Sequence, residues 1–178
     1  MTNKQPREEE VQDLVQQYKE EHDWDTLLSA AKQTSEVVRT LAEAVLTENL
    51  VNTDSMTVLK RLCQHNGRYP VDSKIRDVKN LDIPEDVKNK LEAEITESVG
   101  SVGGTFLEVQ IPEEYEDDAY DFLEVLLTET DKDVLNAAIE DFASLDISGL
   151  QTGRLSPIIH YLHPTKYPIV NGQSIPGM

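Results

Sequence analysis

Two histidines near the carboxyl end, His160 and His163, are the residues of this sequence best spaced to do chemistry. Three residues apart, they share one face of a helix, as a pair of zinc ligands would. Structural and catalytic zinc sites take three or four protein ligands, yet no carboxylate lies near the pair and Cys63 is remote. We therefore expect His160 to be a structural helix residue, and we predict no metal site.

Nucleophilic catalysis is the next chemistry to consider. Ser156 and Ser174 lie near His160, but no Gly-x-Ser-x-Gly turn surrounds either serine and no third group is placed to orient the histidine. A cysteine thiolate needs an electropositive setting, and a half-buried structural role is favoured for Cys63. Its cationic neighbours are Arg61, His65 and Arg68. We predict no catalytic residue, no cofactor and no enzymatic activity.

The strongest compositional feature is negative charge. Thirty-four acidic residues oppose sixteen basic ones, giving a net charge of −18 and a pI near 4.4. One interpretation is that the surface repels nucleic acid, because phosphate binding requires a cationic face. The other, which we favour, is a halophilic source, because the Debye length falls to about 3 Å near molar salt and self-repulsion is screened. Under that interpretation the net charge does not exclude a nucleic-acid partner.

The sequence also indicates the cellular compartment in which the protein is found. Cys63 is the single cysteine, so no internal disulfide can form, and there is no Asn-x-Ser/Thr glycosylation acceptor. The polar, acidic start over 1–10 does not resemble a signal peptide. No stretch approaches the ~20 apolar residues that a membrane span requires. We expect a cytoplasmic protein without membrane contact.

Apolar spacing predicts an all-α or mainly α fold, a compact multi-helix domain over 1–178. Val11, Leu14, Val15 and Tyr18 recur at offsets of three, four and seven, which indicates a helix over 8–21. We expect that helix to pack antiparallel to a longer one capped by Asp25, with both stripes in the core. Further helices are predicted after Asp54 or Ser55, from Pro84 to about 97, from Pro112, from Asp131 and over 155–162.

The segment 99–111 breaks this helical pattern with three glycines. Its residues 105–111 are the best strand candidate, and a loop or small hairpin is an equal alternative. The acidic run that follows, 113–118, lacks the central glycine of an EF-hand, so a solvated helix start is expected there. Negative charge at that end also complements the helix dipole.

The last 32 residues, 147–178, contain no Asp or Glu, although 1–146 is an acidic helical body. Burial is one explanation, because an unpaired buried carboxylate is costly. A contact surface for a polyanion is the other, because Arg154, His160, His163 and Lys166 lie in this segment. The order turn, short helix, turn resembles a helix-hairpin-helix only weakly, because its two glycines are four residues apart.

Within this segment, 149–174 resembles a signature of non-motor regions in McrB-like AAA+ restriction and defence proteins, haloarchaeal members included. The most specific elements are Ile159-His160, Pro164-x-x-Tyr167 and Asn171-x-x-Ser174. The chain departs from the pattern at Gly149-x-x-x-Gly153 and at the proline after Tyr167. The resemblance implies a fragment, a stand-alone accessory version or a degenerate copy, because a motor domain commonly follows in the family and the chain has no phosphate-binding Gly-x-x-x-x-Gly-Lys-Ser/Thr loop.

The resemblance implies a non-catalytic recognition or adaptor domain that senses DNA or docks a partner in a prokaryotic restriction or defence system. The implied partners are DNA and an AAA+ motor or nuclease subunit, and any NTPase or nuclease activity would belong to that partner. Arg154 and Lys166 would meet phosphate, Tyr167 would stack on a base, and His160 and Asn171 complete the contact set. The alternative is an acidic protein-interaction module that binds a basic partner, or mimics DNA, without contacting nucleic acid.

Overall fold

The structure is a computed structural model, and it describes residues 8–21, 24–53, 70–95, 109–150 and 152–167. These ranges contain seven α-helices, one short 3-10 helix and no strand, which confirms the all-α prediction. None of the described helices is long and apolar enough to cross a membrane. The elements are α1 (Glu8–Glu21), α2 (Trp24–Thr47), α4 (Val71–Lys79), α5 (Glu85–Glu94), η2 (Glu113–Tyr115), α6 (Glu116–Thr128), α7 (Lys132–Ala143) and α8 (Thr152–Leu162).

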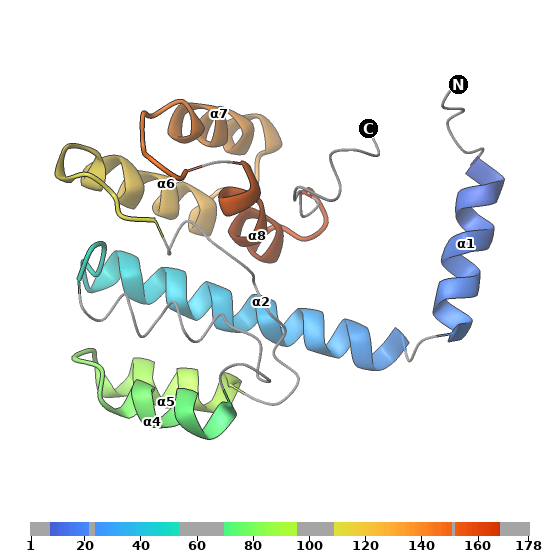
Figure 1. The fold of residues 1–178 in the computed structure, drawn as a ribbon, viewed down its shortest axis with the longest axis horizontal. Coiled ribbons are helices and arrows are strands. Elements are labelled where there is room, and N and C mark those ends of the chain that lie inside the picture. Colours follow the sequence, from blue (N-terminus) through green and yellow to red (C-terminus); the bar gives the residue numbers. More distant parts are fainter. Residues whose placement is uncertain (1–7, 22–23, 54–69, 96–108, 151, 168–178) are drawn as a thin grey trace.

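Helix α2 is the central element of the fold. Its carboxyl-terminal half buries apolar residues on several sides, because α5, α6 and α8 all pack against it. Figure 1 shows α4 and α5 on one side of α2, with α6, α7 and α8 on the other. A helix surrounded in this way needs a broad apolar surface, and α2 provides it. Its fully or nearly fully buried apolar residues are Val37, Val38, Leu41, Ala42, Ala44 and Val45.

The helices predicted from Pro112 and from Asp131 both form, and as α6 and α7 they pack into a helical hairpin. Asp131 caps α7, with its carboxylate accepting hydrogen bonds from the main-chain N–H groups of Asp133 (2.8 Å) and Val134 (3.3 Å). Phe122 and Phe142 are buried, whereas Val134 is 46% exposed. Val134 shares helical spacing with Ala138 and Phe142, but it lies in the first turn of α7 and is not part of the core.

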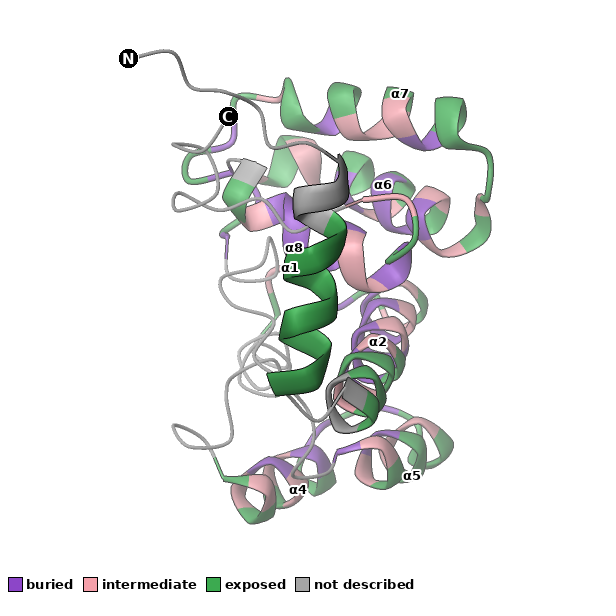
Figure 2. Ribbon diagram, turned by 90° about the vertical axis from the view of Figure 1, so that its right-hand side faces the viewer, coloured by how far each residue is buried: buried purple, intermediate pink, exposed green. Residues whose placement is uncertain are grey.

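Helix α1 forms where it was predicted, but its packing was not predicted correctly. The stripe residues Leu14, Val15 and Tyr18 are 63%, 47% and 47% exposed. Figure 1 shows α1 turned away from α2, and Figure 2 shows its surface as exposed. The expected antiparallel packing is therefore wrong. The core around the second half of α2 is filled by α5, α6 and α8, and Leu28 near the start of α2 is itself 50% exposed.

Residues 109–112 do not form a strand. Asn52, with a positive φ of 60°, accepts a hydrogen bond from the Ile111 N–H (3.0 Å) and donates to the Ile111 carbonyl oxygen. This side chain satisfies both main-chain groups of Ile111, so no neighbouring strand is needed to pair them. The rest of the strand candidate, and the helix predicted after Asp54 or Ser55, lie outside the described residues.

Candidate functional site

The two candidate histidines make internal hydrogen bonds. The Nδ1–H of His160 donates to the Tyr167 carbonyl oxygen (2.7 Å), and the Nε2–H of His163 donates to the Leu126 carbonyl oxygen (2.8 Å). Each of these nitrogens must carry the proton, because a carbonyl oxygen can only accept. Burial lowers the pKa of His163 despite the opposing effect of its hydrogen bond, so its ring is neutral at pH 7. The structural role predicted for His160 agrees with this geometry.

Lys166 connects the end of α8 to the turn between α6 and α7, and Tyr167 connects it to α7. The Lys166 ammonium donates to the Thr130 carbonyl oxygen, and the Tyr167 hydroxyl donates to the Asn136 Oδ1 atom (2.9 Å). Of the remaining predicted contact residues, Arg154 is half-buried in the first turn of α8 and Asn171 lies outside the described residues. Three of the five side chains therefore use a polar group to hold the fold together.

Burial explains why α8 lacks carboxylates. Leu155, Ile158, Ile159 and Leu162 are at most 5% exposed, and α8 packs against both α2 and α6. Figure 2 colours much of this helix as buried. An unpaired carboxylate on that face would lose its hydration without gaining a partner. The missing acidic residues of α8 therefore need no polyanion to account for them.

The negative charge of the molecule is concentrated elsewhere. Residues 113–146, which comprise η2, α6, α7 and their flanks and which we call the acidic hairpin, hold thirteen Asp or Glu residues and a single base, Lys132. About two thirds of the net charge of −18 thus lies in a fifth of the chain. The acidic run 113–118 that stands out in the sequence is only one part of this hairpin. A count of charges along the predicted helices would have found the whole hairpin.

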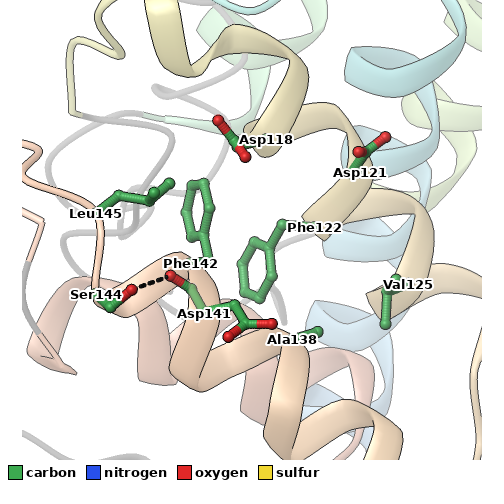
Figure 3. A pocket seen from close by; sticks show the side chains of 9 residues that line it. All are labelled: Asp118, Asp121, Phe122, Val125, Ala138, Asp141, Phe142, Ser144 and Leu145. Atoms are coloured by element: carbon green, nitrogen blue, oxygen red, sulfur yellow. Dashed lines mark hydrogen bonds between the residues drawn. The ribbon is translucent and has the colours of Figure 1, made fainter.

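A groove of about 390 Å³ lies between the two helices of the acidic hairpin. Its floor includes the stacked rings of Phe122 and Phe142, whose centroids are 4.4 Å apart and whose planes differ by 9°. Figure 3 shows these rings flanked by carboxylates, with Asp118 and Asp121 coming from α6 and Asp141 from α7. We call this site the α6–α7 groove. It is lined by Asp118, Asp121, Phe122, Val125, Ala138, Asp141, Phe142, Ser144 and Leu145.

Helical spacing places these carboxylates beside the apolar floor of the groove. On α6, Asp118, Phe122 and Val125 recur at offsets of four and three and share one face. On α7, Ala138 and Phe142 form the matching face, with Asp141 beside them. The two phenylalanines thus meet between the helices, and the aspartates lie at the edges of the same contact.

The groove carboxylates have no cationic partner within the described part of the chain. None of the ion pairs found there includes Asp118, Asp121 or Asp141, and no Lys, Arg or His lines the groove. Across the same described ranges, no three His, Cys, Asp or Glu side chains converge as metal ligands would. The groove therefore presents separated negative charges beside an apolar floor.

A second cavity, of about 420 Å³, lies between α2 and α5, and its charges are partly paired. Lys90 donates to the Glu43 carboxylate there at 3.2 Å. Close by, Glu94 accepts a hydrogen bond from the Thr40 hydroxyl (3.0 Å) through Oε1, whereas its buried Oε2 atom has no hydrogen-bond partner. Burial is the main cause that raises the pKa of Glu94.

Replacing Glu94 tests this electrostatic account. A carboxyl group whose pKa is higher in the folded than in the unfolded protein favours folding while it is protonated. Its contribution to the free energy of unfolding is complete below the unfolded-state pKa and is lost as pH rises through the folded-state pKa. We expect Glu94→Gln to raise the free energy of unfolding at pH 7 by about 1 kcal/mol, with the gain shrinking towards pH 4. Chemical denaturation at both pH values measures it. The exposed Glu124→Gln variant controls for loss of one negative charge, and an equal gain in both variants would contradict the assignment.

Comparison of the chain with protein-family models, curated proteins and solved structures found no match. The resemblance of 149–174 to McrB-like proteins therefore stays a prediction.

Proposed function

We propose that the protein is a non-catalytic docking module that binds a cationic protein through the acidic hairpin. The observation that carries this proposal is the charge of residues 113–146, thirteen acidic residues against one basic residue on adjoining helices. Such a concentration of one sign raises the local concentration of an oppositely charged partner and speeds its association. It corresponds to the acidic protein-interaction module that the sequence left as an alternative.

Docking to a cationic partner agrees with the geometry better than DNA contact through the carboxyl-terminal segment. A DNA surface needs cationic groups free to meet phosphate. The Lys166 ammonium donates to Thr130, and His160 donates to Tyr167. Contact with phosphate would have to compete with these hydrogen bonds. We therefore do not extend the proposal to DNA, to a DNA mimic or to an AAA+ motor.

A peptide titration tests the docking function. The probe is a fluorescent peptide of repeated arginine and glycine, here called the arginine peptide, titrated with the full chain while anisotropy is measured. We expect saturable binding that weakens as salt rises, because part of the attraction is screened. Neutralising three exposed carboxylates of the hairpin (Asp117→Asn, Glu124→Gln, Glu140→Gln) is expected to weaken binding about threefold.

The matched control neutralises three carboxylates outside the hairpin. Asp13, Glu20 and Glu21 are exposed on α1, which lies apart from α6 and α7. Their replacement by Asn, Gln and Gln changes the net charge by the same amount and should leave the affinity nearly unchanged. Equal weakening by both triple variants would contradict docking at the hairpin. Binding of a duplex oligonucleotide in place of the peptide would support the DNA prediction instead.

A further inference from the structure

We infer that the α6–α7 groove receives the side chain of an arginine presented by the cationic partner. This inference rests on the proposed docking function and names the residue type that the hairpin recognises. It follows from three properties of the groove: its apolar floor, the separation of its carboxylates, and the lack of a cationic side chain among the described residues that line it.

The floor suits the aliphatic part of a long cationic side chain. Phe122, Phe142 and Val125 give the groove an apolar base, with Ala138 and Leu145 beside them. Arginine and lysine both carry methylene stems that bury against apolar surface while the charged group stays near solvent. A small hydrated cation has no such stem, so this part of the groove would contribute nothing to its binding.

The carboxylates that line the groove suit a planar cation with several donors. Asp118 and Asp121 approach from α6 and Asp141 from α7, so the carboxylates lie on both sides of the stacked rings. They do not converge as the ligands of a metal ion would. A guanidinium group spreads five N–H donors over a fixed fork and can meet two carboxylates at once. The lysine ammonium is a compact point charge, so its match to separated carboxylates is poorer.

The cation is expected to come from another molecule. Lys132 is the single base of the acidic hairpin, and it does not line the groove. A second copy of the chain is a poor occupant, because each copy carries a net charge of −18 and the two would repel. A cationic protein segment brings the complementary charge together with the arginine stem that fills the floor.

Paired triple variants separate groove recognition from general attraction. The groove variant carries Asp118→Asn, Asp121→Asn and Asp141→Asn, and the rim variant carries Asp117→Asn, Glu124→Gln and Glu140→Gln. Both change three carboxylates on the same two helices, and both include one site in the first turn of α6. Each is titrated with the arginine peptide, with a lysine peptide of the same length, and with a peptide in which citrulline replaces arginine. Citrulline keeps the stem and shape of arginine but has no charge.

The groove variant is expected to weaken arginine-peptide binding about thirtyfold, against about threefold for the rim variant. The wild-type chain should bind the lysine peptide about tenfold more weakly than the arginine peptide, and the citrulline peptide not measurably. At high salt the rim effect should disappear while most of the groove effect persists, because contacts in a partly enclosed groove are screened less.

Two outcomes would overturn the inference, and they differ from failure of the docking function. Equal weakening by the groove and rim variants, or equal affinity of the wild-type chain for the arginine and lysine peptides, would show that the hairpin binds charge without using the groove. In both cases the docking function would stand. If neither cationic peptide binds the wild-type chain at low salt, the docking function itself is lost. Concentration-dependent sedimentation without peptide would identify a second copy as the occupant, which also contradicts the inference.

Discussion

Ile158→Asp is expected to unfold the protein or leave it only marginally folded. Ile158 is fully buried in α8, and α8 packs against α2 and α6. The substitution removes an apolar side chain and introduces a carboxylate that would lose its hydration without a partner. A loss above about 4 kcal/mol is expected, which is a large part of the 5–15 kcal/mol typical of a domain. Circular dichroism and denaturant unfolding measure the effect.

A carboxylate at an exposed position of the same helix is the matched control. Gly153 is exposed in the first turn of α8, where negative charge complements the helix dipole and where aspartate is a better helix former than glycine. Gly153→Asp should therefore be neutral or slightly stabilising. If both variants fold with wild-type stability, burial does not explain the lack of acidic residues in α8. A contact surface for a polyanion would then be the better explanation.

Leu41→Ala is expected to lower the free energy of unfolding by about 3 kcal/mol. Leu41 is fully buried in the half of α2 that α5, α6 and α8 surround. Truncation there removes apolar contacts and leaves a cavity that neighbouring helices can close only in part. Urea denaturation, with the midpoint and slope reported separately, gives the change directly.

The same truncation on α1 is the control for Leu41→Ala. Leu14 is 63% exposed, so Leu14→Ala should change the free energy of unfolding by less than about 0.5 kcal/mol. If the loss at Leu14 matched the loss at Leu41, the α1 stripe would be packed in the core, as the sequence predicts. The arrangement of α1 apart from the other helices would then be wrong.

Most helix positions could be predicted from local signals, because most helices carry their own apolar period and some begin at a capping residue or after a proline. Asp131 caps α7, and Pro84 precedes α5, which ends near Ile95. Helix α4 was missed. Its apolar stripe includes Val71, Ile75 and Val78 at helical spacing. The fully buried Lys74 lies on the same face and interrupts the apolar pattern.

Tertiary placement could not be predicted in the same way. The stripes of α1 and α2 have the same period, yet only the carboxyl-terminal half of the α2 stripe is covered, because burial depends on which helices pack against it. Period and amphipathicity report that a face is apolar, and they do not report what packs on it. The hydrogen bond between Asn52 and Ile111 joins positions 59 residues apart, and no local sequence pattern predicts it.

The composition of the candidate site could be predicted from the sequence, but its geometry could not. The acid-free segment was noticed because of its composition, and burial accounts for the lack of acidic residues in the part of it that forms α8. The acidic hairpin is more relevant to binding, and its charge is visible in the sequence. The α6–α7 groove, however, depends on Phe122 and Phe142 meeting between two helices. That contact appears only when the helices are placed in space.

The most direct test of the docking account is to map where a cationic probe binds. Two-dimensional ¹H–¹⁵N NMR spectra of the labelled full chain would be recorded while the arginine peptide is added. The account predicts saturable shifts at the amides of 118–125 and 138–145, with those of 152–167 nearly unchanged. Shifts concentrated on 152–167, or weak shifts spread over every acidic helix alike, would contradict it.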